Sequence, residues 1–350
     1  MSGGRGTRLR PITHTSAKQL VPVANRPLLF YGIEAIRDAG ITDFGIVVGD
    51  TREEIKAAVG DGSKFGVKVT YIHQQDPLGL AHAVKVSRDY LQDDSFVMFL
   101  GDNLIRDGIT QLVERFRSEK PNSQILLAKV KNPQEFGVAE LAGERVIRLE
   151  EKPKQPRSDL ALVGVYMFDK TIWEAVDGIK PSKRGELEIT DAIQYLIDKK
   201  YDVRSHIITG WWKDTGKLED MLEANRMILG GAAAQIDGTI SADTRVEGSV
   251  IVGAGSTVEG SVLRGPLIIG AGCTIRRAYI GPFTSIADHC QVIDSEVEHS
   301  IILDGSRIEG LRRRLESSLI GKDVTVTRQP DRVPAAYRLM VGDHSNIEVM

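Results

Sequence analysis

The sequence predicts an α/β protein in two parts, a doubly wound Rossmann-like domain followed by a left-handed parallel β-helix of hexapeptide repeats. Three observations support this prediction. Strand-like and helix-like runs alternate through the first 229 residues, glycine becomes denser from residue 230, and aliphatic residues then recur every six positions. Because 350 residues exceed the usual length of one domain, we expect one domain at 1–229 and a second at 230–350.

Alternating runs define the first part. Four amphipathic helices are expected, each with apolar residues three or four positions apart. This order predicts a mostly parallel sheet with helices on both faces. The expected strands are 43–48, 68–72, 95–100, 124–130 and 160–168, and the expected helices are 29–39, 52–59, 79–90 and 109–119.

The second part is predicted to be a solenoid, with each repeated aliphatic side chain pointing inward. The alternative is a set of glycine-rich hairpins, for which a spacing of six has no reason to persist. Residues 328–350 fit neither pattern. The repeated positions are Ile240, Val246, Val252, Val258, Ile269, Ile275, Ile280, Ile286, Val292, Ile302, Ile308, Ile320 and Val326.

Composition excludes several functions. The 45 basic and 48 acidic residues give a net charge of −3, which argues against a surface for nucleic acid or an anionic membrane. No apolar run reaches the roughly 18 residues of a membrane span. Cys273 and Cys290 cannot form a disulfide framework, and no leader precedes the first motif, so we expect a cytoplasmic protein.

The chain opens with a glycine-rich segment. Gly3, Gly4 and Gly6 allow backbone N–H groups to surround a phosphate, and Arg8 can neutralise the negative charge of that phosphate. The alternative is a frayed terminus. Because the segment lacks both the Gly-Lys-Ser/Thr of a Walker A loop and the third glycine of a GxGxxG motif, an ordinary ATPase or dehydrogenase is disfavoured.

An acidic residue follows an apolar strand in Leu100-Gly101-Asp102-Asn103. The carboxyl ends of strands are where open α/β sheets bind ligands, so Asp102 is a candidate metal ligand. The competing interpretation is a turn or cap residue.

The glycine-rich segment is part of a longer motif. Gly-Gly-x-Gly-Thr-Arg-Leu-x-Pro-x-Thr, at 3–13, is followed by Lys-x-Leu-x-Pro-Val at 18–23. This pattern resembles the signature of the sugar-1-phosphate nucleotidylyltransferases. With the C-terminal repeats, the chain resembles most the long-form glucose-1-phosphate thymidylyltransferases over nearly its whole length. It departs in carrying Arg26 where many relatives have Lys, and in having no apolar strand before the loop, so we expect the first central strand to be missing.

The resemblance implies roles for individual residues. Arg8, Lys18 and Lys152 would neutralise phosphate charge, and Asp102 would pair with Asp214 around Mg²⁺, which prefers few carboxylates plus substrate phosphates. The competing interpretation of Tyr166 and Trp211 is that both are core aromatics. We expect His73 and His82 to border the loop around Gln74 and Gly79 without contacting the base. The triphosphate would be held by Gly3, Gly4, Gly6 and Thr7, the pyrimidine base by Gln74 and Gly79, and the sugar phosphate by Gly137, Glu151, Lys152, Gly164 and Tyr166.

The implied reaction is attack by a phosphate oxygen of glucose 1-phosphate on the α-phosphorus of dTTP, with loss of pyrophosphate. A phosphate monoester is already anionic at neutral pH, so no general base is needed. The alternatives are UTP as the nucleotide, a bifunctional nucleotidyl/acyltransferase with His289 or His299 as base, and a sensor without turnover. The solenoid suits subunit contacts, so a homo-oligomer is expected.

Overall fold

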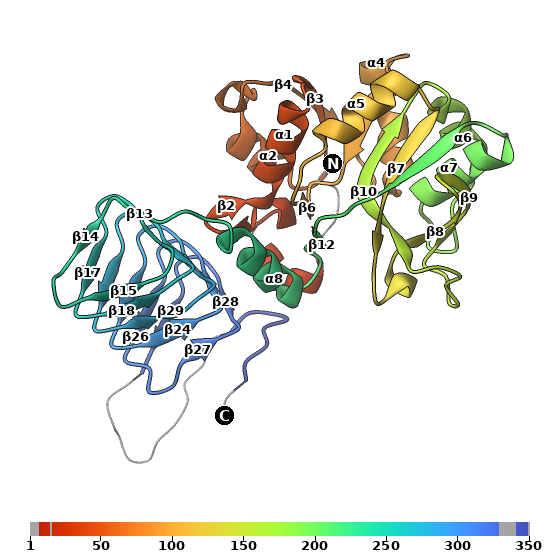
Figure 1. Cartoon of the computed structure of the whole chain (residues 1–350). Coiled ribbons are helices and arrows are strands. Elements are labelled where there is room, and N and C mark those ends of the chain that lie inside the picture. Colours follow the sequence, from red (N-terminus) through yellow and green to blue (C-terminus); the bar gives the residue numbers. More distant parts are fainter. Residues whose placement is uncertain (1–6, 15, 329–340, 349–350) are drawn as a thin grey trace. The chain divides into compact units, whose positions relative to one another are not determined.

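A computed structural model of the chain describes residues 7–14, 16–328 and 341–348 (Figure 1). Its Cα positions divide into two compact units. The first unit contains residues 16–20 and 28–214, and the second contains the described residues among 7–14, 21–27 and 215–348. No helix in these ranges is both long enough and apolar enough to cross a membrane.

The first unit is built on a six-stranded sheet with the order β5-β10-β7-β11-β9-β8. Strands β7 and β11 are parallel, but β10 is antiparallel to both β5 and β7. The sheet is therefore mixed and not mostly parallel as expected, because the chain leaves β7 through the β8–β9 hairpin and returns in the opposite direction as β10. The strands are β5 (Phe96–Phe99), β7 (Ser123–Lys129), β8 (Gly137–Ala142), β9 (Arg145–Glu151), β10 (Leu160–Phe168) and β11 (Val203–Ile207).

Two smaller sheets complete the first unit. Strands β3 (Asp43–Val48) and β4 (Lys68–His73) are parallel. Strands β6 (Asn103–Ile105) and β12 (Trp212–Asp214) are antiparallel. Among the described residues, β3 and β5 belong to separate sheets, with no strand assigned between them.

Seven α-helices belong to the described part of the first unit. The expected helix at 79–90 is split at Ser87, whose hydroxyl donates to the Ala83 carbonyl oxygen and so competes with the regular helical bonds. Phe168, Ile193 and Leu196 are fully buried in the core between the six-stranded sheet and α6–α7. The helices are α1 (Leu28–Asp38), α2 (Arg52–Val59), α3 (Leu80–Val86), α4 (Arg88–Leu91), α5 (Thr110–Glu119), α6 (Ile172–Gly178) and α7 (Ile189–Asp198).

The second unit contains helix α8 (Leu218–Leu229) and a β-helix whose coils form three parallel sheets (Figure 1). Val258, Ile275 and Val292 stack on successive coils with their side chains fully buried, which confirms the solenoid. Val246 is an exception at 42% exposure, because its strand β15 is the first of its sheet and pairs on one side with β18.

The strands of the β-helix are short, as the six-residue spacing requires. They are β13 (Gln235–Ile236), β14 (Thr239–Ile240), β15 (Arg245–Glu247), β16 (Val250–Val252), β17 (Thr257–Glu259), β18 (Val262–Arg264), β19 (Leu267–Ile269), β20 (Thr274–Arg276), β21 (Tyr279–Ile280), β22 (Thr284–Ile286), β23 (Gln291–Ile293), β24 (Glu296–Glu298), β25 (Ile301–Ile302), β26 (Arg307–Glu309), β27 (Leu315–Glu316), β28 (Leu319–Ile320) and β29 (Thr325–Thr327).

A hairpin near the N-terminus packs on the β-helix within the second unit. Strands β1 (Pro22–Val23) and β2 (Arg26–Pro27) are joined by Ala24 and Asn25, both at positive φ. The Asn25 amide donates to the Ile286 carbonyl oxygen at 2.6 Å. The side chain of Asn225, on α8, accepts from the Ala24 N–H at 2.8 Å. Polar side chains therefore fix the position of this hairpin.

Candidate active site

Two carboxylates from distant parts of the sequence converge on one ammonium group in the first unit. Lys18 begins the short 3₁₀ helix Lys18–Leu20, and its side chain is 8% exposed. Its Nζ lies 2.5 Å from Asp102 Oδ2 and 3.8 Å from Asp214 Oδ1. Asp214 reaches this point because β12 pairs with β6 in a register that sets Asp214 opposite Asn103.

The environment keeps Asp102 ionised. Burial by itself raises the pKa of a carboxyl group, but the charge of Lys18 and hydrogen bonds from Lys18 and Asn103 outweigh that effect. The pKa of Asp102 is therefore lowered from its usual value. A metal ligand must be deprotonated, so this carboxylate is already in the form that binds a cation.

The donor set fits Mg²⁺. Within residues 7–14, 16–328 and 341–348, no three His, Cys, Asp or Glu side chains are grouped so as to hold a metal ion. Mg²⁺ does not need such a cage, because it is commonly bound by one or two carboxylates together with substrate phosphates and water. Asp102 and Asp214 would be the two carboxylates, since an oxygen of each lies within 4 Å of Lys18 Nζ.

Asn103 connects this site to its surroundings, and sequence reasoning missed it. Its side chain is 4% exposed. Nδ2 donates to Asp102 Oδ1 at 3.0 Å, while Oδ1 accepts from Trp212 Nε1 at 2.5 Å and from the Gly164 N–H at 3.3 Å. The feature of the sequence that could have identified Asn103 is its position directly after Asp102, at the end of an apolar strand. Trp212 donates to Asn103 in this cluster, whereas the sequence analysis named only its neighbour Trp211.

A second cluster forms around Glu151, at the end of β9. Gly137 lies opposite Glu151 in the β8–β9 hairpin. A Cβ on Gly137 would come within 2.6 Å of Thr190 Cγ2 and 3.2 Å of Glu151 Oε2, so glycine is required there. Thr190 Oγ1 donates to Glu151 Oε2 at 3.2 Å. Burial, together with the negative charge of Glu188, raises the pKa of Glu151.

Lys152 follows Glu151 with its ammonium group toward solvent. Its φ is +44° and its side chain is 47% exposed. Nζ lies 4.0 Å from Glu151 Oε1, at the limit of an ion pair. The ammonium is therefore close to the Glu151 cluster and accessible to an anion from outside.

Gly164 and Tyr166 both lie on β10, and each is close to at least one of the two clusters. A Cβ on Gly164 would lie 2.6 Å from Asn103 Nδ2, so the missing side chain leaves room for that amide. Tyr166 is buried and stacks on Phe168 as a core aromatic. Burial raises the pKa of Tyr166, and the negative charges of Glu151, Asp102 and Asp214 raise it further. The phenol therefore lies within electrostatic range of both clusters.

The loop predicted to bind the base, around Gln74 and Gly79, is closely packed. Gly79 has a φ of +105°, and a Cβ there would lie 2.5 Å from the Leu187 carbonyl oxygen, so this position requires glycine. Gln74 is buried, and its Nε2 lies 3.0 Å from His82 Nδ1 and donates to the Gly79 carbonyl oxygen at 3.3 Å. His82 therefore holds Gln74 directly and does not merely border the loop, whereas His73 ends β4.

The remaining predicted residues lie elsewhere. Arg8 is exposed in the 3₁₀ helix Thr7–Leu9 of the second unit, with its guanidinium beside Gly216 of the same unit. Gly3, Gly4 and Gly6 fall outside the described residues, as does the side chain of Thr7. Their roles stay predictions.

The chain was compared with known proteins. Residues 1–230 match the family model described as "Nucleotidyl transferase". A glucose-1-phosphate thymidylyltransferase of Streptomyces griseus is 57% identical over 350 residues, which are 100% of this chain and 98% of the relative. The bifunctional protein GlmU of Methanocaldococcus jannaschii is 35% identical, over 92% of this chain and 77% of the relative. The crystal structure of a putative glucose-1-phosphate thymidylyltransferase from Bacillus anthracis in complex with a sucrose superposes with a TM-score of 0.61 and 36% identity, covering 65% of this chain and 92% of that one.

Proposed function

The chain belongs to the nucleotidyl transferase family, and from this premise we propose that it converts dTTP and glucose 1-phosphate to dTDP-glucose and pyrophosphate. One structural observation supports this proposal in addition to membership of the family. Asp102, Asp214 and Lys18 converge on one point, which suits a divalent cation and a triphosphate together. The identity of 57% to a thymidylyltransferase over the full chain supports the choice of substrates.

The chemistry requires charge neutralisation more than acid–base catalysis. A phosphate oxygen of glucose 1-phosphate forms a bond to the α-phosphorus of dTTP, and the bond from that phosphorus to the bridging oxygen of pyrophosphate breaks. The nucleophile is already an anion at neutral pH, so no side chain has to remove a proton. The obstacle is the repulsion between two polyanions, which fixed positive charges reduce.

Named residues can supply that neutralisation. Mg²⁺ held by Asp102 and Asp214 would supply positive charge against the triphosphate oxygens. The buried ammonium of Lys18 lies beside both carboxylates and adds a fixed charge at the same place. Lys152 has an accessible ammonium and would bind the sugar phosphate.

Recognition of the two substrates would use the other two clusters. The Glu151 carboxylate can accept hydrogen bonds from sugar hydroxyls, and Gly137 keeps the space beside it open. At the base loop, Gln74 Nε2 contacts His82 and Gly79, so Oε1 is the atom of this amide that would accept the N3–H of thymine. Uracil carries the same N3–H, so UTP is the competing nucleotide, and the thymine methyl distinguishes the two by about 1–3 kcal/mol at most.

The test is pyrophosphate release with Mg²⁺ and glucose 1-phosphate, run in parallel with dTTP, UTP, ATP, GTP and CTP. We expect the highest kcat/KM with dTTP. Lys152→Ala should remove most of the turnover with an unchanged melting curve, whereas Lys154→Ala, which alters an exposed neighbour, should retain it. No pyrophosphate release with any of the five nucleotides would overturn the proposal and favour a sensor.

Two further properties accompany the proposed reaction. We propose that copies of the chain associate through the β-helix, which light scattering of the full chain checks. We also propose a reducing, cytoplasmic environment, because Cys273 and Cys290 are both free and buried. Acyl transfer by the β-helix is a separate activity, and incubation with acetyl-CoA and an amino-sugar phosphate would detect it.

A further inference from the structure

Lys18 belongs to a short segment that is held by a residue far away in the sequence. The N–H of Ala17, which directly precedes Lys18, donates to Glu54 Oε2 at 2.6 Å. Glu54 lies in the first turn of α2, 37 positions along the chain from Ala17. A hydrogen bond to a carboxylate is shorter and stronger than one to a neutral acceptor. The backbone beside Lys18 is therefore fixed by a side chain of another element.

Glu54 makes this contact in place of a local one. Thr51-Arg52-Glu53-Glu54 has the pattern of a capping box, in which the side chain of Glu54 would accept from the Thr51 N–H. Within the described residues, α2 has no side-chain capping bond at Thr51. Glu54 Oε2 accepts from Ala17 instead, so this carboxylate is directed toward the Lys18 segment and not toward the start of its own helix.

Apolar contacts hold the same segment on both sides of Lys18. Ala17 is buried in a cluster that includes Ile55 of α2. Leu20, at the end of the 3₁₀ helix, packs against the same cluster. Apolar contact has no preferred direction, whereas a hydrogen bond weakens steeply when its angle changes. The cluster therefore holds the segment in place, and the bond to Glu54 sets the orientation of its backbone.

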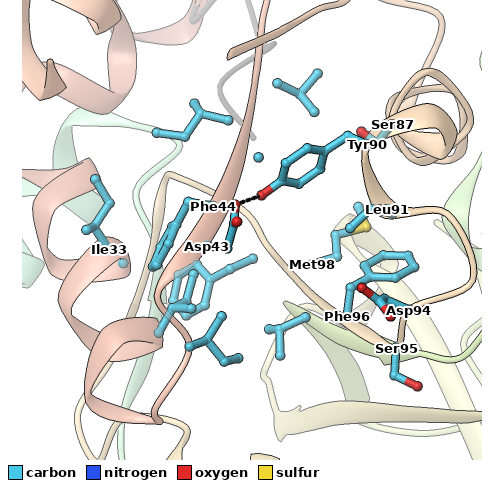
Figure 2. A pocket seen from close by; sticks show the side chains of 18 of the residues that line it. Ile33, Asp43, Phe44, Ser87, Tyr90, Leu91, Asp94, Ser95, Phe96 and Met98 are labelled. Atoms are coloured by element: carbon cyan, nitrogen blue, oxygen red, sulfur yellow. Dashed lines mark hydrogen bonds between the residues drawn. The ribbon is translucent and has the colours of Figure 1, made fainter. Parts of the chain in front are cut away.

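Strand β3, which leads into α2, is fixed at both of its ends. Figure 2 shows the first end, where the Tyr90 hydroxyl donates a hydrogen bond to Asp43. At the second end, the Val48 carbonyl oxygen accepts from the Gln74 N–H at 2.9 Å. Both bonds are to residues outside the Lys18 segment, so α2 has a support that does not depend on that segment.

The placement of the Lys18 ammonium matters because it faces two carboxylates. Nζ lies 2.5 Å from Asp102 Oδ2 and 3.8 Å from Asp214 Oδ1. A rotation of the Ala17 peptide group would carry the Lys18 backbone with it and move the ammonium relative to both carboxylates. A displacement of about 1 Å in an active site can cost roughly 100-fold in rate. A residue that fixes this peptide group can therefore affect turnover without contacting a substrate.

We propose that Glu54 is a positioning residue, which acts through the Ala17 N–H to hold Lys18 in the orientation that the reaction needs. This role rests on the function proposed above, in which Lys18 supplies positive charge beside the triphosphate. Loss of the Glu54 acceptor should lower kcat. It should leave KM for glucose 1-phosphate near its native value, because Glu151 and Lys152 form a separate cluster.

The first experiment compares three variants by steady-state pyrophosphate release. Glu54→Met removes the acceptor at similar side-chain length, whereas Glu54→Gln keeps an acceptor oxygen. Glu53→Met is the matched control, because it removes the same charge from the same turn and Glu53 is 84% exposed. We expect kcat to fall about 10- to 100-fold in Glu54→Met and to stay close to the native value in the other two. Native kcat in Glu54→Met, or an equal loss in either of the others, would overturn the proposal.

Melting curves of the same variants separate positioning from a purely structural role. We expect Glu54→Met to be fully folded at the assay temperature, with its loss confined to kcat. Glu54→Asp keeps the charge but shortens the side chain, and it gives the same comparison where Glu54→Met melts early. A lower melting temperature with native kcat, or a rise in KM for glucose 1-phosphate as large as the loss in kcat, would assign Glu54 a structural role only and overturn the proposal.

The second experiment observes the contact itself, by NMR hydrogen exchange of the Ala17 amide in the full chain without substrates. We expect slow exchange in the native chain and in Glu54→Gln, and faster exchange in Glu54→Met. Unchanged exchange in Glu54→Met would contradict the contact. No pyrophosphate release by the native chain would overturn the proposed function, and this role of Glu54 with it. Native turnover with an unaltered kcat in Glu54→Met would overturn the role of Glu54 alone.

Discussion

The indole Nε1 of Trp212 donates a hydrogen bond to Asn103 Oδ1 at 2.5 Å, across the pair of strands that brings Asp214 to Asp102. Asn103 in turn donates to Asp102 at 3.0 Å. A residue that binds a metal ligand in this way orients the carboxylate without touching the metal, and removing such a partner typically costs 10–100-fold in metal affinity.

We therefore predict that Asn103→Leu raises the Mg²⁺ concentration needed for half-maximal activity by roughly 10-fold or more. The titration is read from pyrophosphate release at saturating substrates. Trp212→Phe is the matched control, because it removes one donor to Asn103 but keeps an aromatic ring against Phe136. Its effect should be smaller, and an unchanged Mg²⁺ dependence in Asn103→Leu would contradict the assignment.

The second prediction concerns Lys18. Lys18→Met keeps most of the side-chain volume but leaves the Asp102 carboxylate without its cation, so its pKa should rise. Because Asp102 is partly exposed at 24%, we expect a loss of about 1–3 kcal/mol in unfolding free energy at neutral pH, below the range for a fully buried pair. Activity should fall far more than this loss of stability explains.

The sign of the pH dependence follows from the lowered pKa. In the native protein, the pKa of Asp102 lies below that of the unfolded chain, so its stabilisation is present above the unfolded value of about 3.9 and is lost as the pH falls through the folded value. The difference between the native chain and Lys18→Met in urea unfolding should therefore shrink below about pH 4. A constant difference would show that lost packing, and not charge, destabilises the variant.

Local patterns predicted individual elements well. The strands at 43–48 and 160–168 have the predicted bounds, since continuous apolar runs between turn residues are strong signals. The order of the sheet was not predictable in the same way, because β10 takes its place through pairing with β5 and β7 and not through its own composition. The split at Ser87 depends on one side-chain hydrogen bond, which helical periodicity does not reveal.

In the candidate site, too, residues within motifs were predictable from the sequence, whereas residues that act through distant partners were not. Asp102 and Asp214 were predicted from motifs, and the structure brings both to Lys18. Asn103 and His82 were not assigned roles, because their importance comes from partners at other places in the chain. Asn103 acts through the β6–β12 register, and His82 through its contact with Gln74.

The third prediction concerns the pH dependence of sugar binding. Burial and the charge of Glu188 raise the pKa of Glu151, so Glu151 is protonated, and loses an acceptor, at a higher pH than an ordinary carboxyl group. The acid limb of kcat/KM for glucose 1-phosphate should therefore lie above pH 4.5, the ordinary value. Glu188→Gln removes the neighbouring charge and should move this limb to lower pH.

The control for that shift is Glu186→Gln. Glu186 also contacts Arg184, but it is not among the groups that perturb Glu151. Its acid limb should stay at the native position. An unmoved limb in Glu188→Gln would show that another group controls the acid side of the profile.

A fourth prediction tests the hold of His82 on Gln74. In His82→Ala, Gln74 Nε2 loses its 3.0 Å partner, and the amide is free to rotate. One lost hydrogen bond of about 1 kcal/mol corresponds to roughly a 5-fold rise in KM for dTTP, with KM for glucose 1-phosphate unchanged. His73→Ala, at the end of β4, is the control and should leave both constants near their native values. A rise in both KM values in His82→Ala would indicate a general disturbance of the fold.

The fifth prediction compares a buried and a half-exposed aliphatic residue of the hexapeptide pattern. It tests whether the contribution of such a residue to stability depends on its burial or on the repeat sequence alone. Ile275 is fully buried between coils, whereas Val246 is a repeated aliphatic residue of another sheet, on the first strand of that sheet, and is 42% exposed. Ile275→Ala should cost about 2–5 kcal/mol in β-helix stability, because the neighbouring coils close the cavity only in part. Val246→Ala should cost less than about 0.5 kcal/mol, since a half-exposed side chain leaves no internal void. Chemical denaturation of both variants checks the difference, with hydrogen exchange in β20 as the local readout. Equal losses would mean that stability depends on the repeat sequence itself and not on the packing between coils.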